Sequence, residues 1–185
     1  YAAGMLGWSV VDVGLFGILA VLTSAVFAWL GGRADSRFGP KPVIVACVLI
    51  LGGVATAIVF VSRQSVLGLP VASDSALPDI AFYILGASIG AAGGALQSAS
   101  RTMMVRQAEP GHMTQGFGLY ALAGKATAFL APLSIGIVTD LTGSQAAGIT
   151  PLIALFLLGL VLLFWVEPEG ARAAWHPSEP SSPPA

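Results

Sequence analysis

Charged residues are scarce in this 185-residue chain, because Asp, Glu, Lys and Arg together make up only 9% of it. A soluble domain carries roughly 25% charged residues. The eight basic and nine acidic residues leave a net charge of −1, which excludes the excess of Lys and Arg that nucleic-acid binding needs. With 56% apolar residues and a mean hydropathy of +0.85, the chain has more apolar surface than a soluble fold can bury. We therefore expect a membrane protein with no nucleic-acid partner.

Cysteine and histidine are almost as scarce. A single cysteine, Cys47, cannot form an intramolecular disulfide, and two histidines, His112 and His176, cannot make a zinc site by themselves. The apolar runs also contain no pairing of a nucleophile with a base and no set of metal ligands, which an intramembrane enzyme would need. We therefore expect no catalytic residue, no metal, no cofactor and no enzymatic activity.

Long apolar runs fill the space between the few charges. Four of them contain no charged residue, at 13–32, 42–62, 80–100 and 141–166, and a fifth, at 117–139, is interrupted only by Lys125. About 20 helical residues cross roughly 30 Å of hydrocarbon, and lipid offers no partner to an unpaired backbone. The sequence thus predicts an all-α polytopic membrane protein with transmembrane helices at about 13–32, 42–62, 80–105, 116–140 and 149–166.

The two ends of the chain differ from these runs. Residues 1–7 are typical of the last turns of a helix whose beginning is missing, so we expect the end of a sixth helix there. Residues 167–185 are polar and hold five of the twelve prolines, which predicts a disordered tail. Six of the eight basic residues fall on one side when the connections alternate, so that side, with the tail, should be cytoplasmic.

Small residues recur every four positions along the run that begins at residue 80. Gly86, Gly90, Gly94 and Ser98 form one smooth stripe, which predicts close packing against another helix. Gln97 lies beside this stripe, and a buried amide in hydrocarbon should find a polar partner or face a cavity. Arg101 follows one turn later, where it either anchors or braces the cytoplasmic end or contacts a substrate.

Lys125 is the only charge in the interior of a predicted span, because Arg101 and Asp140 lie near the ends of theirs. It lies about 12 Å into its helix, near the midplane, where a charge costs several kcal/mol unless it is paired or hydrated. Such residues in transporters often meet the substrate. The alternative is a structural partner, either a carboxylate elsewhere in the protein or carbonyls freed near Gly124 and Pro132.

The connection between the first two predicted helices reads Gly-Gly-Arg-Ala-Asp-Ser-Arg-Phe-Gly-Pro-Lys-Pro over residues 31–42. On its own it is a short charged loop, but it resembles the G-x-x-x-D-R-x-G-[RK]-[RK] loop of the major facilitator superfamily, with Ser36 inserted. That resemblance implies a cytoplasmic latch made by Gly31, Asp35, Arg37, Gly39 and Lys41, near the end of the helix that carries Arg101. Four helices follow the loop, which fits the second copy of this motif and thus the C-terminal half of a twelve-helix fold, spanning residues 1–166.

Two further stretches resemble one branch of that superfamily. Residues 93–101 resemble G-G-x-Q-x-x-S-R, and residues 117–132 resemble F-G-x-Y-x-L-x-G-[KR]-x-[TS]-x-F-x-x-P, patterns of the vacuole effluxers. The fungal members of that branch are autophagy-related amino-acid exporters of the vacuole. The resemblance implies a secondary active transporter that exports small polar solutes, amino acids above all, by alternating access. It makes Lys125, Gln97 and Tyr120 the candidate substrate contacts.

The resemblance also implies partners and a location. The partners are the lipid bilayer, a missing N-terminal half and a small-molecule substrate; the location is the plasma membrane in a prokaryote or the vacuolar membrane in a fungus. The alternative function is a membrane scaffold or sensor that keeps the fold without transport. A lysine at the midplane counts against that alternative.

Overall fold

The computed structural model describes residues 2–72, 75–108 and 110–168. Five helical segments in this described part are long and apolar enough to cross a membrane, which confirms the predicted all-α membrane fold with five spans. The tail predicted at 167–185 falls almost entirely outside the described residues. The elements, in chain order, are η1 (Ala2–Leu6), α1 (Val10–Phe38), α2 (Pro40–Val59), β1 (Ser65–Val66), β2 (Leu69–Pro70), α3 (Leu77–Gln107), η2 (Pro110–His112), α4 (Met113–Thr127), α5 (Leu130–Thr142) and α6 (Gln145–Phe164).

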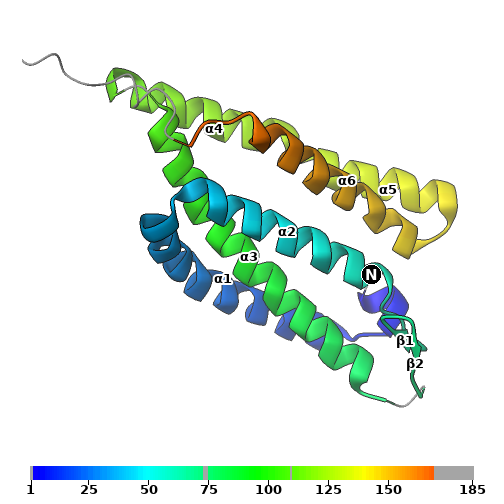
Figure 1. Cartoon of the computed structure of the whole chain (residues 1–185). Helices are drawn as coiled ribbons and strands as arrows, with labels where there is room; N and C mark the ends of the chain where they lie inside the picture. The colour runs from blue at the N-terminus through cyan, green and yellow to red at the C-terminus, as the bar shows by residue number, and fades with distance from the viewer. Residues whose placement is uncertain (1, 73–74, 109, 169–185) are drawn as a thin grey trace, which may run out of the picture.

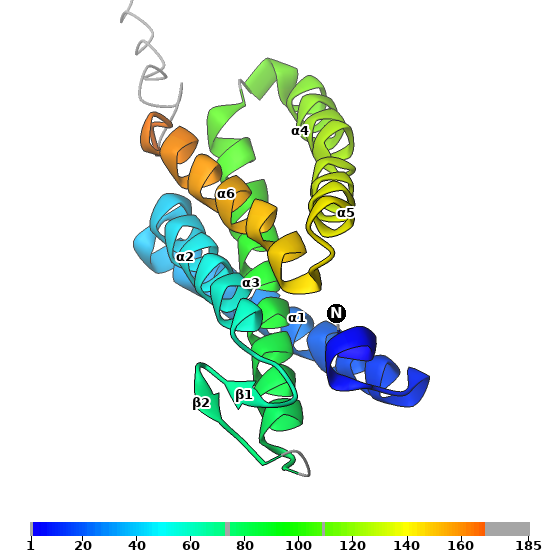
Figure 2. The ribbon, with the colours of Figure 1, turned by 90° about the vertical axis from the view of Figure 1, so that its right-hand side faces the viewer.

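Helix α3 is the centre of the arrangement. It packs along α1 on one side and α2 on the other, while α6 packs on α2 and on α5 (Figure 1). Helices α4 and α5 follow one another as a bowed pair that stands away from most of α3, as Figure 2 shows. The chain start and the β1–β2 hairpin lie at one end of the bundle, and the start of α4 lies at the other. The side of α3 between α1 and α4 is therefore left without a covering helix in the described chain.

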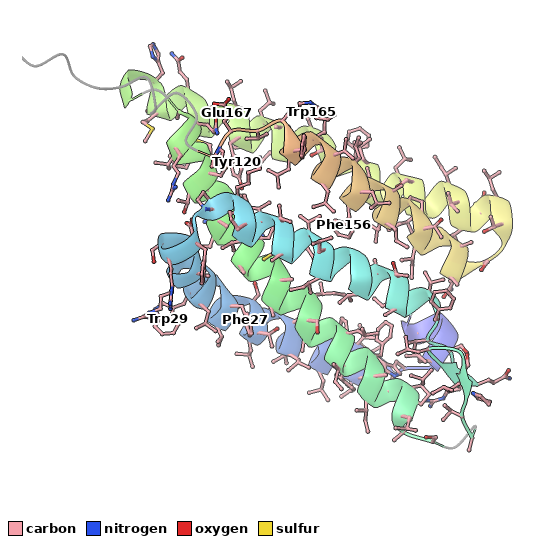
Figure 3. All side chains as sticks on the ribbon, in the orientation of Figure 1. Phe27, Trp29, Tyr120, Phe156, Trp165 and Glu167 are labelled. Carbon is pink, nitrogen blue, oxygen red and sulfur yellow. The ribbon has the colours of Figure 1, made fainter. Side chains whose placement is uncertain are left out.

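The core between α2 and α3 is built from small and medium side chains. Cys47 and Leu51 on α2 are buried against Ala95 and Ala99 on α3, and Ala99 is completely inaccessible to solvent. Large apolar side chains lie instead on the outer surface, where Phe27 and Trp29 project from α1 (Figure 3). This distribution suits helices that contact lipid on one side and each other on the other.

The boundary between α1 and α2 differs from the prediction. Residues 31–38, expected in a loop, continue α1, and only Gly39 separates the two helices. Gly39 has a positive φ of 84°, which a glycine adopts without strain, and Pro40 opens α2 with the φ that a first helical turn needs. The charges at the end of α1 therefore do not mark where the helix ends.

The fifth predicted helix, at 116–140, is also different, because it is divided. Helix α4 ends at Thr127 and α5 begins at Leu130, with Ala128 and Phe129 between them. Pro132 accounts for the division, since it has no N–H to donate and its ring clashes with the carbonyl of Ala128 four residues earlier. The two helices together still form one apolar segment, Met113–Thr142.

The connection between α2 and α3, expected as a loop at 63–79, contains a short hairpin. Strands β1 and β2 pair in antiparallel register, with Val66 opposite Leu69. The two residues between them, Leu67 and Gly68, both have positive φ, as a two-residue hairpin turn of this hand requires. The sequence offers a glycine only at the second position, which is why the turn was not predicted.

Candidate functional site

Three glycines bring the backbone of α3 against α1. A Cβ atom added to Gly90 would lie 2.2 Å from the carbonyl oxygen of Ala20, and one added to Gly94 would lie 2.1 Å from that of Ser24. A Cβ on Gly86 would overlap the ring of Phe16. The two helices therefore approach more closely than any residue with a side chain would allow at these positions.

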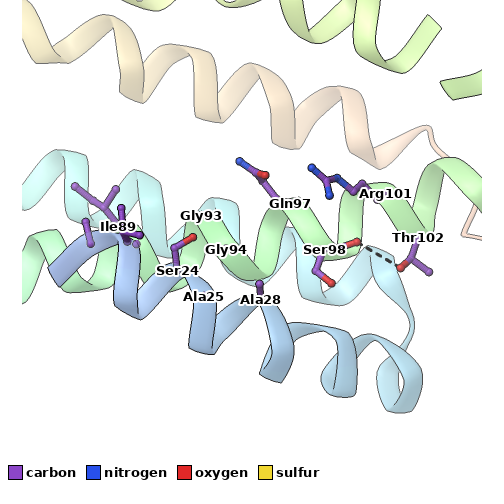
Figure 4. A pocket seen from close by; sticks show the side chains of 13 residues that line it. Ser24, Ala25, Ala28, Ile89, Gly93, Gly94, Gln97, Ser98, Arg101 and Thr102 are labelled. Atoms are coloured by element: carbon purple, nitrogen blue, oxygen red, sulfur yellow. Dashed lines mark hydrogen bonds between the residues drawn. The ribbon is translucent and has the colours of Figure 1, made fainter. Parts of the chain in front are cut away.

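A groove of about 780 Å³ runs alongside this contact, and Gly90 and Gly94 are part of its lining. Its polar lining is Ser24 on α1 together with Gln97, Ser98, Arg101 and Thr102 on α3. Figure 4 shows Gln97 and Arg101 projecting from α3 on the same side, as their spacing of four residues requires. Both side chains are exposed, and neither has a hydrogen bond or an ion pair within the described residues. An amide and a guanidinium are thus available to a ligand in the groove.

Tyr120 belongs to a second cavity. The phenol oxygen of Tyr120 lies 2.8 Å from the Ser100 hydroxyl, which joins α4 to α3. The cavity around this pair has a volume of about 460 Å³ and is lined by Met103, Met104 and Gly116, among others. Neither Gln97 nor Arg101 lines this cavity. The structure therefore separates Tyr120 from the groove that holds the other polar residues.

Lys125 lies in the last turn of α4 and is exposed. It lines neither the groove nor the second cavity, and its ammonium group has no partner among the described residues. The helical phase explains this placement, because Lys125 is about 180° around α4 from Gly116, which faces α3. The three residues predicted as substrate contacts, Lys125, Gln97 and Tyr120, are not brought together by the described chain.

The residues predicted as a latch lie in three different environments. Gly31 is packed against Ala95 of α3, and Asp35, on the same face of α1, is only 4% exposed. One carboxylate oxygen of Asp35, Oδ1, is buried and has no hydrogen-bond partner in the described chain. The guanidinium of Arg37 lies over the ring of Phe38, 5.4 Å from its centroid. Asp35 is thus the latch residue whose side chain most needs a further partner.

Lys41, the last residue of the motif, contacts the end of α6. Its ammonium group donates hydrogen bonds to the carbonyl oxygens of Phe164 and Val166, at 3.2 and 2.6 Å. The last carbonyls of a helix have no partner within the helix and carry partial negative charge, which a lysine complements. Lys41 therefore ties α2 to α6 at this end of the bundle.

A polar cluster at the opposite end was not predicted. Asp79, in the first turn of α3, accepts hydrogen bonds from the indole N–H of Trp8 at 2.6 Å and from Arg63 at 2.7 Å. The Trp8 ring stacks on Tyr83 and makes an edge contact with Phe82. The Trp8 side chain is buried and belongs to the core at this end of the bundle. The available signal was that alternation of the connections leaves Arg63 as the only basic residue on its predicted side, where it needs an acidic partner.

Comparison with known proteins places the chain among transporters. Residues 76–175 match the family described as "Vacuole effluxer Atg22 like". Autophagy-related protein 22 of Cryptococcus neoformans is 30% identical over 175 residues, which cover 93% of this chain and 30% of that protein. An uncharacterized MFS-type transporter of Bacillus subtilis, YxiO, is 25% identical over 148 residues, 80% of this chain and 31% of its own length. The chain thus spans about a third of these relatives. No solved structure gives a significant match.

Proposed function

Because this chain belongs to the vacuole effluxer Atg22-like family, we propose that the complete protein is a secondary active transporter that exports amino acids by alternating access. The observation that carries the proposal is the groove between α1 and α3, in which Gln97 and Arg101 have no partner. Polar side chains within a membrane span are costly unless they face water or a ligand, and in transporters they mark the substrate pathway.

The open side of α3 supports the same proposal. Because the chain spans about a third of its relatives, we propose that the complete protein includes an N-terminal half that packs over this side. The substrate would then bind between the two halves, near the midplane, and the halves would rock about it. The latch residue Asp35 would accept a hydrogen bond from a helix end of that half through its unpaired Oδ1.

Within this proposal the groove residues have different roles. The amide of Gln97 can both donate and accept hydrogen bonds, so it can orient a polar solute. The guanidinium of Arg101 can bind a carboxylate with two parallel hydrogen bonds. Both groups recognise amino acids without selecting a particular side chain. The chain lies in the membrane of the vacuole if the organism is a fungus and in the plasma membrane if it is a prokaryote, with the Arg-rich ends of its helices in the cytoplasm.

The test is counterflow of labelled amino acids in liposomes that contain the full-length protein. Gln97→Ala should reduce exchange about tenfold, because the substrate loses a hydrogen bond in a site that excludes bulk water. Gln107→Ala is the matched control, since Gln107 is on the same helix but donates its side-chain hydrogen bond to the backbone of Glu167 at the end of the bundle. The control should exchange at the wild-type rate.

Each result separates the candidate functions. Loss of exchange in Gln97→Ala with a normal Gln107→Ala supports an amino-acid transporter with its site in the groove. If both variants exchange at the same rate, the protein is still a transporter, but Gln97 does not bind the substrate. If the wild-type protein exchanges no amino acid, amino-acid transport is wrong, and a scaffold or sensor that retains the fold becomes the better description.

A further inference from the structure

Two arginines and two aromatic rings lie on the surface of α1, at the end of the bundle where the predicted latch residues lie. The guanidinium of Arg33 is 4.1 Å from the centroid of the Trp29 ring, and that of Arg37 is 5.4 Å from the centroid of the Phe38 ring. All four side chains are exposed. Both distances are within the range of a cation–π contact. The rings therefore hold the two guanidinium groups against this surface.

The arginines point away from the rest of the bundle. Gly31 packs against α3, and Arg33, two residues later, is about 200° around the helix from it. Trp29, Arg33 and Arg37 are spaced by four residues and so share one outer face of α1. Figure 3 shows Trp29 projecting from this face. The nearest acidic residue in the sequence, Asp35, is buried on the side that faces α3, so it does not neutralise the two arginines.

No other carboxylate in the described chain pairs with them. Among the described residues the one ion pair joins Arg63 to Asp79, at the other end of the bundle. Two further cations near the arginines of α1 have different surroundings, because Lys41 donates to carbonyls of α6 and Arg101 lines the groove. Two like charges one helical turn apart, about 6 Å, repel each other. The outer face of α1 therefore favours a negatively charged partner.

The same face is apolar over the turns that precede the arginines. Val26, Leu22 and Ile18 continue the face that includes Trp29, and each is more than half exposed. From Trp29 to Ile18 the helix rises about 16 Å, which is about half the thickness of the hydrocarbon core. A partner that covers the whole face must therefore combine a negative charge at one end with an apolar body about one leaflet deep. A phospholipid with an anionic headgroup has this form, whereas a soluble anion matches only the charged end.

We propose that the outer face of α1 binds one anionic phospholipid. Its phosphate lies between Arg33 and Arg37, whose guanidinium groups donate charge-assisted hydrogen bonds to the phosphate oxygens. One acyl chain lies along Trp29, Val26 and Leu22. The site is separate from the proposed transport site, because this face is turned away from α3 and from the groove. The proposed N-terminal half packs over the side between α1 and α4, which leaves the outer face of α1 in contact with lipid.

The test compares two lipids on the full-length protein in detergent. Phosphatidylglycerol and phosphatidylcholine with the same acyl chains are added in equal amounts, and native mass spectrometry measures how much of each stays bound. The wild type should retain phosphatidylglycerol preferentially, because the choline group of the other lipid carries a positive charge that the arginines repel. Arg33→Gln and Arg37→Gln should each lower this preference about fivefold, since one arginine near a membrane surface contributes about that factor. Unchanged binding of phosphatidylcholine shows that the variants remain folded.

Arg106→Gln is the matched control. Arg106 lies in the last turn of α3, at the same end of the bundle, so this variant loses the same charge and leaves the outer face of α1 intact. It should keep the wild-type preference for phosphatidylglycerol. Trp29→Leu keeps the apolar surface but removes the ring from Arg33, and it should lower the preference about twofold.

Three results would overturn the lipid site. Equal losses of preference in Arg106→Gln and Arg33→Gln would show that net charge alone attracts the lipid. A wild type without any preference would show that a carboxylate outside the described residues already neutralises the arginines. Displacement of bound phosphatidylglycerol by an equal concentration of glycerol phosphate, its soluble headgroup, would show that the apolar face contributes nothing to binding.

Discussion

The ammonium group of Lys41, in the first turn of α2, lies 2.6 Å from the carbonyl oxygen of Val166, two residues beyond the end of α6. A second hydrogen bond, of 3.2 Å, reaches the carbonyl of Phe164. These residues are separated by more than 120 positions in the sequence, so the contact closes the bundle between its second and last helices. Lys41, the last of the predicted latch residues, therefore has a structural role that does not depend on transport.

Replacement of Lys41 should therefore weaken the fold. Lys41→Met keeps the length of the side chain but removes both hydrogen bonds, and we expect a loss of about 1 kcal/mol in the free energy of unfolding because the lysine is partly exposed. Lys41→Arg should recover most of the loss, since a guanidinium also donates to carbonyls. Denaturation of the full-length protein in detergent measures the unfolding free energy of both variants. A Lys41→Met variant as stable as the wild type would show that the contact contributes nothing.

The glycine contact between α1 and α3 gives a sharper comparison. A Cβ on Gly94 would lie 2.1 Å from the carbonyl oxygen of Ser24, while one on Gly93, the adjacent residue, would meet nothing within 4 Å. Gly94→Ala should therefore cost about 2 kcal/mol or more, because backbone has to move to relieve the overlap. Gly93→Ala should be neutral or slightly stabilising, since alanine favours the helix. Thermal unfolding of the two variants in one detergent distinguishes these outcomes, and equal melting temperatures would contradict the close approach.

Sequence patterns predicted the spans but not the ends and breaks of the helices. The apolar runs located all five spans because length and hydropathy are set by the bilayer. Charge was a poor guide to where α1 ends, since the helix continues through its charged residues and ends only at Gly39, before Pro40. The division before Pro132 follows from a single residue that has no backbone N–H to donate. A break caused by one residue does not change the hydrophobic periodicity of the sequence, so the apolar pattern did not predict it.

The candidate site was harder to predict for a related reason. Gln97 and Arg101 are on one face of one helix, and spacing alone placed them together correctly. Lys125 and Tyr120 are on α4, whose rotation about its axis depends on how it packs against α3. The hydrogen bond between Tyr120 and Ser100 fixes that rotation and turns Lys125 to the other side of the helix. A motif gives the order of such residues along the chain, but the packing of its helix decides which of them meet.

Asp79 joins three segments at the end of the bundle opposite Lys41. It accepts hydrogen bonds from Trp8, which precedes α1, and from Arg63, which precedes the hairpin. The ion pair with Arg63 is partly exposed and contributes little by itself, whereas the buried Trp8 N–H would lose its only acceptor here. We expect Asp79→Ala to cost about 2 kcal/mol of unfolding free energy and Arg63→Ala about 0.5 kcal/mol. Denaturation measures the two losses of unfolding free energy. Asp140→Ala is the control, because the Asp140 carboxylate is exposed and has no partner in the described chain. A larger loss in Arg63→Ala than in Asp79→Ala would assign the stabilisation to the ion pair instead.

The contact between Tyr120 and Ser100 predicts how firmly α4 is held. Helix α4 has no buried residue in the described chain, and its 2.8 Å hydrogen bond to α3 joins two hydroxyls. Tyr120→Phe and Ser100→Ala should each cost about 0.5 to 1 kcal/mol, and the double variant should cost little more than either one, because both remove the same bond. Additive losses in this double-mutant cycle would show that the two residues act separately. If they are coupled, hydrogen exchange should be faster in α4 than in α3 in all three variants, since α4 then depends on its connection to α5 and α6 for its position.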